Sequence, residues 1–168
     1  MGPVKTLVLG GARSGKSLVA ERLAANSART VTYVATVRLG NDEDLVARVA
    51  AHRERRPSAW LTIECGDNLP DVLASTNGTV LVDSLGPWLA ALPNMQCDLD
   101  VLVAALRARR EDTIIVSEEV GLGVHPETAV GREFRDALGA LNQALAQECD
   151  HVLLVVAGRT LSLPRNDA

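Results

Sequence analysis

The segment KTLVLGGARSGKS, residues 5–17, decides the fold of this chain. Its first part, Lys5 to Leu9, is an apolar run that predicts a buried strand. The next residues, Gly10-Gly11-Ala12-Arg13-Ser14-Gly15-Lys16-Ser17, match the phosphate-binding pattern GxxxxGK[ST] and lead into a helical pattern. A strand, this loop and a helix in that order predict an α/β fold of the P-loop NTPase (RecA-like) class.

Each residue type in this loop has a role in binding a nucleotide. Glycines let backbone N–H groups curve around phosphate oxygens, and the helix N-terminus adds a favourable dipole. Lys16 is predicted to be catalytic, because it neutralises the β- and γ-phosphates, and the Ser17 hydroxyl is predicted to bind Mg²⁺. The predicted nucleotide-binding residues of the loop are Gly10, Gly11, Ala12, Arg13, Ser14, Gly15, Lys16 and Ser17.

The rest of the chain alternates between strand and helix patterns. Apolar, β-branched runs predict strands at 5–9, 30–35, 60–64, 79–83, 113–117 and 151–157. Helical patterns lie at 16–25, 42–55, 67–74, 85–92, 99–110 and 127–148, the last with Pro126 near its first turn. The alternation predicts a mostly parallel sheet with helices on both faces, and the run 160–163 predicts a C-terminal antiparallel edge hairpin. Residues 1–168 are expected to form a single catalytic domain, because no repeat or linker divides them.

Composition excludes several function classes. A net charge of -4 gives no basic field for a nucleic acid or an anionic membrane surface. No run of apolar residues is long enough to predict membrane insertion. The three cysteines are far apart and unpaired in pattern, which favours a reducing, cytoplasmic location over a disulfide framework or a zinc site.

A second candidate for phosphate chemistry is Asp83, which ends the apolar run TVLVD at 79–83. An acid in this place beside a P-loop contacts magnesium or nucleotide, so Ser17 and Asp83 are the predicted Mg²⁺ ligands. An alternative is that Asp83 caps the following helix. The segment DSLG at 83–86 also fits a GTPase switch, but the chain has no lysine after Lys16 for a guanine-reading Asn-Lys-x-Asp loop. A nucleotide-dependent regulatory module is therefore disfavoured against an enzyme.

His52 is a candidate nucleophile. Arg48, His52 and Arg56 are four residues apart in turn, so a helix places them on one face. Neighbouring positive charges favour the neutral, nucleophilic imidazole and would bind the phosphates of a nucleotide, which suits attack on an α-phosphate. A solvated, arginine-rich helix with an incidental histidine has the same spacing, so spacing leaves both interpretations open. Without a role for His52, the chain would be a simple small-molecule kinase.

The motifs together resemble a known family. The stretches that carry the resemblance are GGARSGKS (10–17), YVAT (33–36), the run from Asp42 through Arg48 to AHRERRP (51–57), WLTIE (60–64), LVD (81–83), EVGLGVHPE (119–127), FRD (134–136), LNQ (141–143) and VVAG (155–158). They resemble the bifunctional adenosylcobinamide kinase/adenosylcobinamide-phosphate guanylyltransferases of cobalamin biosynthesis. The resemblance covers nearly the whole chain.

This resemblance implies an enzyme that carries out two reactions in turn. The first phosphorylates the aminopropanol hydroxyl of adenosylcobinamide with a nucleoside triphosphate, ATP or GTP. In the second, a histidine, here His52, attacks the α-phosphate of GTP and passes GMP to adenosylcobinamide phosphate. The resemblance also implies a homotrimer and nucleotide contacts from Ala35, Thr36, Val37, Arg53, Glu54, Arg55, Arg56, Glu64 and Asp83. Glu64 or Asp83 would read the N1 and N2 edge of guanine, and the sequence does not decide between them.

Overall fold

The computed structural model describes residues 2–37, 50, 53–54 and 56–165 of the 168-residue chain. Its strands form one seven-stranded sheet in the order β3-β2-β4-β5-β1-β6-β7. Neighbouring strands pair in parallel, except for β6 and β7, which are antiparallel. The strands are β1 (Lys5–Gly10), β2 (Val31–Ala35), β3 (Leu61–Glu64), β4 (Thr79–Asp83), β5 (Thr113–Glu118), β6 (His151–Val156) and β7 (Arg159–Ser162). The predicted parallel sheet and its C-terminal hairpin are confirmed.

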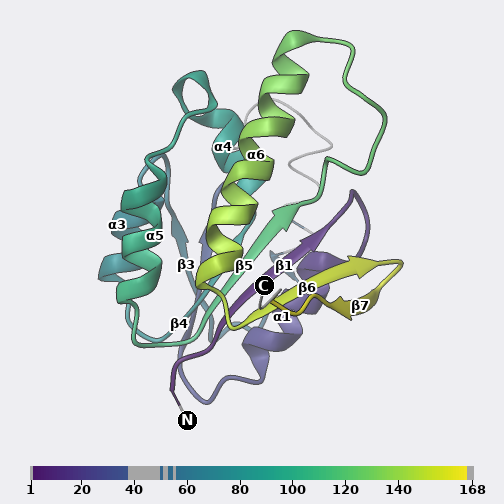
Figure 1. Ribbon diagram of the computed structural model, residues 1–168. Helices are drawn as coiled ribbons and strands as arrows, with labels where there is room; N and C mark the ends of the chain where they lie inside the picture. The colour runs from purple at the N-terminus through teal and green to yellow at the C-terminus, as the bar shows by residue number, and fades with distance from the viewer. Residues whose placement is uncertain (1, 38–49, 51–52, 55, 166–168) are drawn as a thin grey trace.

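Helices cover both faces of the sheet, as predicted (Figure 1). They are α1 (Lys16–Ala25), α3 (Leu69–Ser75), α4 (Leu85–Ala91), α5 (Leu99–Ala108) and α6 (Ala129–Glu148), with a 3-10 turn at Pro93–Met95. α1 packs on one face over a core that includes Val8 and Val116. The larger core lies on the other face, under α3, α4, α5 and α6, and includes Leu7 and Val82. Alternate residues of β1 and of β4 and β5 thus enter opposite cores, as buried parallel strands require.

The described helices differ from the predicted ranges by one or two residues at several ends, and two of these differences have a clear local cause. The last helix begins at Ala129 rather than at 127, because the Thr128 hydroxyl caps it by accepting the N–H of Gly131 at 3.1 Å. α5 ends at Ala108 rather than at 110, because Arg109 is extended and turns its side chain inward. The predicted helix at 42–55 lies almost entirely outside the described residues.

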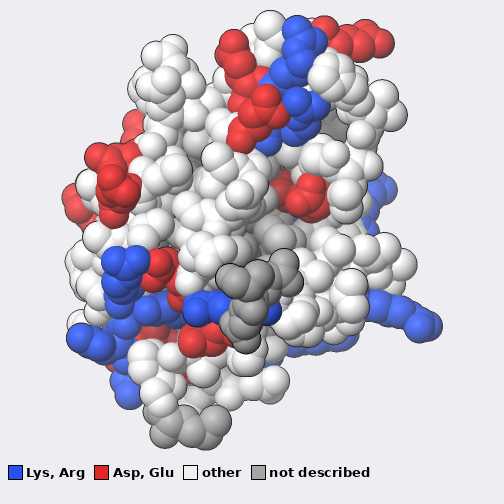
Figure 2. Space-filling model, in the orientation of Figure 1, with Lys and Arg blue, Asp and Glu red and all other residues white. Residues whose placement is uncertain are grey.

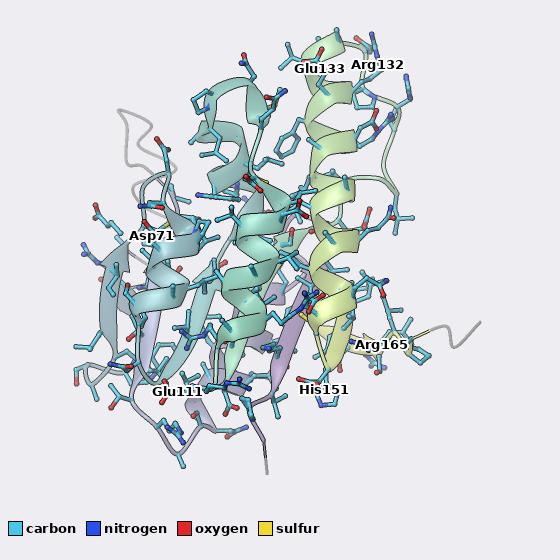
Figure 3. The ribbon with its side chains drawn as sticks, turned by 60° about the vertical axis from the view of Figure 1, so that its left-hand side comes forward. Asp71, Glu111, Arg132, Glu133, His151 and Arg165 are labelled. Carbon is cyan, nitrogen blue, oxygen red and sulfur yellow. The ribbon has the colours of Figure 1, made fainter. Side chains whose placement is uncertain are left out.

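The residues labelled in Figure 3 mark the two ends of the parallel strands. Figure 3 shows Glu111 and His151 at the edge where β5 and β6 begin, opposite the end of α6 that is marked by Arg132. Acidic and basic side chains stand close together on the face drawn in Figure 2, and Arg107 and Glu148 form an ion pair of this kind at 2.6 Å.

None of the helices within the described ranges is long and apolar enough to cross a membrane.

The edge where the strands begin is held by a buried arginine. Arg109 is only 6% exposed, and its guanidinium donates to the carbonyls of Leu73, Thr76 and Gly78 and to the Thr113 hydroxyl at 2.7–2.8 Å. Burial lowers the pKa of Arg109 from its ordinary value, and Glu111 opposes this shift. The arginine therefore ties the end of α3 to the starts of β4 and β5.

We expect Arg109→Ala to lower the free energy of unfolding by about 3 kcal/mol, because it leaves buried carbonyl groups without a donor. Urea denaturation followed by circular dichroism measures this loss. Arg110→Ala, at the exposed neighbouring position, is the matched control and should change stability by less than about 0.5 kcal/mol. Equal losses in the two variants would show that the buried hydrogen bonds contribute nothing particular.

Candidate active site

The loop between β1 and α1 has the backbone that phosphate binding requires. Gly15 has φ 93°, a left-handed conformation that favours glycine. A Cβ atom on Gly10 would lie 2.4 Å from Ser14 Oγ and 2.8 Å from the carbonyl of Val155, so only glycine fits there. Glycine is therefore required at both positions for the loop to take this conformation. Gly11, Ala12 and Arg13 are exposed to solvent.

Hydrogen bonds fix the loop from inside and from the β6–β7 hairpin. The buried Ser14 accepts the Lys16 backbone N–H on its hydroxyl at 3.3 Å, and its carbonyl accepts the N–H of Gly158 at 2.8 Å. The Lys16 ammonium donates to the Gly11 carbonyl at 3.3 Å. The loop is thus held ready for an anion, with the lysine folded across it.

The two predicted metal ligands meet beside this loop. Ser17 Oγ donates to Asp83 Oδ1 at 3.1 Å, and the Tyr33 hydroxyl donates to Asp83 Oδ2 at 3.1 Å. A hydroxyl and a carboxylate oxygen in contact offer the hard oxygen ligands that Mg²⁺ prefers. Within the described residues no group of three or more His, Cys, Asp or Glu is arranged to hold a metal.

Asp83 is not placed as the cap of α4. The N-cap position of that helix is Ser84, whose side chain makes no capping bond. The free N–H of Gly86 is instead bound by Glu118 at 2.8 Å. Asp83 therefore faces the phosphate loop, while a carboxylate from another strand satisfies the start of α4.

Tyr33 and Arg56 form a stack beside Asp83. The Arg56 guanidinium carbon lies 3.4 Å from the centre of the Tyr33 ring, within cation–π range. Burial is the main cause that raises the pKa of Tyr33 above its ordinary value; Asp83 raises it further and Arg56 lowers it. The stack fixes Arg56, a predicted nucleotide contact, at the same edge of the sheet as Asp83.

The predicted contacts on β2 and β3 fall into line with Asp83. The register pairs Ala35 with Asp83 on one side and with Glu64 on the other. Thr36 is buried, and its hydroxyl donates to the Ser84 carbonyl at 2.7 Å and accepts the Ser84 N–H at 2.9 Å. The Thr36 side chain thus holds β2 against the β4–α4 connection. Val37 is half-buried and Glu64 is exposed.

Glu118 also belongs to this site, although it was not among the site residues predicted from the sequence. It ends β5, between the strand of the phosphate loop and the strand of Asp83. Its Oε1 lies 3.7 Å from Lys16 Nζ and accepts the Ser84 hydroxyl at 2.7 Å. The signal was present, because 113–118 is an apolar run that ends in an acid, just as 79–83 does.

Part of the predicted site falls outside the described residues. His52 and Arg55 are in this group. Arg53 and Glu54 are described, and both are helical and exposed. The structure brings together the residues from Gly10 to Ser17, Ala35, Thr36, Arg56 and Asp83; Glu64 lies on the edge strand β3, beyond β2.

We expect the phenol of Tyr33 to remain protonated in the folded protein well above its ordinary pKa of about 10. Because folding raises the pKa of Tyr33, its contribution to stability is fully present below the unfolded pKa of about 10. That contribution is lost as the pH rises from there through the higher pKa of the folded protein. The chain has a single tyrosine, so ultraviolet absorbance of tyrosinate reports on this residue alone. The urea-unfolded protein is the control and should titrate near pH 10. Matching curves for folded and unfolded protein would contradict the expectation.

Comparison with known proteins identifies the family. The family model described as "Cobinamide kinase / cobinamide phosphate guanyltransferase" matches residues 6–163. The "Bifunctional adenosylcobalamin biosynthesis protein CobP" of Pseudomonas aeruginosa is 40% identical over 171 residues, covering 95% of this chain and 97% of the relative. The "Bifunctional adenosylcobalamin biosynthesis protein CobU" of Salmonella typhimurium is 36% identical over 174 residues, covering 90% and 95%.

Among solved structures, an ATPase from the type III secretion system of pathogenic bacteria is similar in fold. It has a TM-score of 0.52 at 10% identity and covers 95% of this chain and 56% of that one. At this identity the likeness bears on the fold alone, and it agrees with the predicted P-loop NTPase class. With a family match over almost its entire length, the chain belongs to the cobinamide kinase/cobinamide phosphate guanyltransferase family.

Proposed function

We propose that this chain phosphorylates the aminopropanol hydroxyl of adenosylcobinamide and then transfers GMP from GTP to the product, giving adenosylcobinamide-GDP. The observation that carries the proposal is the match to the family over residues 6–163. The contact of Ser17 with Asp83 beside the phosphate loop supports the nucleotide chemistry that both reactions need. ATP and GTP are the proposed nucleotide substrates.

In the kinase reaction, the phosphate loop and Lys16 hold the triphosphate. Lys16 Nζ now contacts the Gly11 carbonyl and Glu118, so it is already placed over the loop that would receive the phosphates. Ser17 and Asp83 would hold Mg²⁺, and when bound the ion neutralises charge on the β- and γ-phosphates. The loop glycines orient the phosphates by backbone N–H groups, and these need no rearrangement when charge develops.

In the guanylyltransferase reaction, we propose His52 as the nucleophile. Its ring nitrogen forms a bond to the α-phosphorus of GTP as the bond to pyrophosphate breaks. A phosphate oxygen of adenosylcobinamide phosphate then attacks the same phosphorus and releases the histidine. The stacking of Arg56 on Tyr33 supports this role for the segment, because it holds the residue four positions after His52 at the nucleotide edge.

We propose that Glu64, rather than Asp83, reads the guanine base. Asp83 accepts hydrogen bonds from Ser17 and Tyr33, which belong to the phosphate end of the site. Glu64 is exposed and lies two strands farther from the phosphate loop, roughly 10 Å at the usual strand spacing. That distance suits a base at the far end of a triphosphate.

The proposal includes the setting of the enzyme. Residues 1–168 form one catalytic domain that works in the cytoplasm, where the three cysteines stay reduced. It assembles as a homotrimer, like the family it belongs to, and acts on small molecules rather than on nucleic acid. Gel filtration with light scattering tests the assembly.

We expect His52→Asn to abolish GMP transfer while phosphorylation of adenosylcobinamide continues. The protein is incubated with α-labelled GTP and Mg²⁺, denatured, and treated with acid or base before the label is mapped. A phosphoramidate on histidine is labile to acid and stable to base. The chain has three histidines, so His125→Asn and His151→Asn serve as matched controls that should keep the label. Retained label in His52→Asn, or none in the unaltered protein, would reject the histidine mechanism and leave a kinase alone.

A further inference from the structure

The carboxylate of Glu118 has hydrogen-bond partners besides its ion pair with Lys16. Oε1 accepts the Ser84 hydroxyl at 2.7 Å and Oε2 accepts the Gly86 N–H at 2.8 Å, so both oxygens are oriented by the β4–α4 connection. The Glu118 carbonyl is held as well, by the Asn142 side-chain amide at 3.1 Å. Even when Lys16 turns to a phosphate, Glu118 keeps these other partners.

The place of this carboxylate is the phosphoryl end of the site. A P-loop lysine binds the β- and γ-phosphates, and Lys16 Nζ lies 3.7 Å from Glu118 Oε1. β5 carries Glu118 between β1 and β4, so it stands between the phosphate loop and Asp83. Its side chain is 22% exposed, so an acceptor can reach it from solvent.

The kinase reaction needs a group in this place. The acceptor is a hydroxyl, and its proton must leave as the oxygen bonds to phosphorus. Asp83 is turned to Ser17 and Tyr33, and it is our proposed metal ligand. Glu118 is the carboxylate that the described part of the structure records in ion-pair contact with Lys16.

We propose that Glu118 is the catalytic base of the phosphorylation reaction and binds the hydroxyl of the acceptor. The hydroxyl oxygen forms a bond to the γ-phosphorus, and the β–γ bridging P–O bond breaks with its electron pair going to the nucleoside diphosphate. The hydroxyl proton passes to the Glu118 carboxylate and then to water. This inference rests on the proposed kinase function. It assigns no task to Glu118 in GMP transfer, where the attacking atoms, an unprotonated imidazole nitrogen and a phosphate oxygen, carry no proton that must be removed before attack.

The direct test is Glu118→Gln, assayed for both half-reactions. Glutamine keeps an acceptor for the Gly86 N–H. Its amide N–H can donate to Ser84 Oγ, which reverses the direction of that hydrogen bond but keeps the two residues paired. We expect kcat for phosphorylation of adenosylcobinamide to fall by roughly 10²–10⁴-fold, the usual contribution of a positioned base. KM for the nucleotide should stay close to that of the unaltered protein, and labelling by α-labelled GTP should continue.

A second variant moves the carboxylate without removing its charge. A methyl group on Gly86 would lie 2.3 Å from Glu118 Oε2 and must displace it. Alanine is also favoured over glycine inside a helix by about 1 kcal/mol, so folding of Gly86→Ala is not at risk from helix propensity. We expect Gly86→Ala to lower kcat for phosphorylation while GMP labelling continues. Glu133→Gln, which alters an exposed carboxylate on α6, is the matched control with kinase activity unchanged.

The outcomes separate the possibilities. Loss of phosphorylation alone in Glu118→Gln and Gly86→Ala supports the base. Equal losses of phosphorylation and GMP labelling mean that Glu118 only supports the loop, and full kinase activity in Glu118→Gln excludes the base directly. Both of those results overturn this inference and leave the proposed function intact. Absence of phosphorylation in the unaltered protein rejects the kinase function and this inference together.

Discussion

The site depends on the parallel pairing of β4, β5 and β1. Parallel strands end at the same edge, and the register sets Gly10 beside Glu118 and Asp83 beside Val116. The phosphate loop therefore lies close to the carboxylates of Glu118 and Asp83, although the three are far apart in the sequence. Ligands in open α/β sheets bind at this carboxyl edge for the same reason.

Hydrogen bonds around Ser84 hold the same end of the sheet together. Thr36 exchanges hydrogen bonds with the backbone of Ser84, and Glu118 bonds to the Ser84 side chain. β2, β4 and β5 thus share a single residue as a junction. A substitution at Ser84 would remove a hydrogen-bond partner of Glu118 on β5 and could shift the end of β2, which Thr36 holds to the Ser84 backbone.

The sequence was sufficient for the fold wherever a local pattern carried the information. The strand before Gly10 and the loop up to Ser17 are contiguous, and the run that ends in Asp83 has a recognisable form. Glu118 also follows an apolar run, but its contact with Lys16 was not predicted, because that contact comes from the strand order that places β5 between β1 and β4. The structural role of Arg109 was not predicted for a similar reason, because its acceptors at Leu73, Thr76 and Gly78 come from a distant part of the chain.

Strand order also gives the acids of the site different chemical surroundings. Along the carboxyl edge, Glu118 ends β5, Asp83 ends β4 and Glu64 ends β3, with β2 between the last two. Glu118 meets the ammonium of Lys16, Asp83 meets the hydroxyl groups of Ser17 and Tyr33, and Glu64 is exposed to solvent. With the roles proposed above, a triphosphate bound on the loop with its base directed toward β3 would pass the proposed proton acceptor, the proposed metal ligand and the proposed base reader in turn. Because strands lie about 4.8 Å apart, the separation of these tasks is set by the sheet itself.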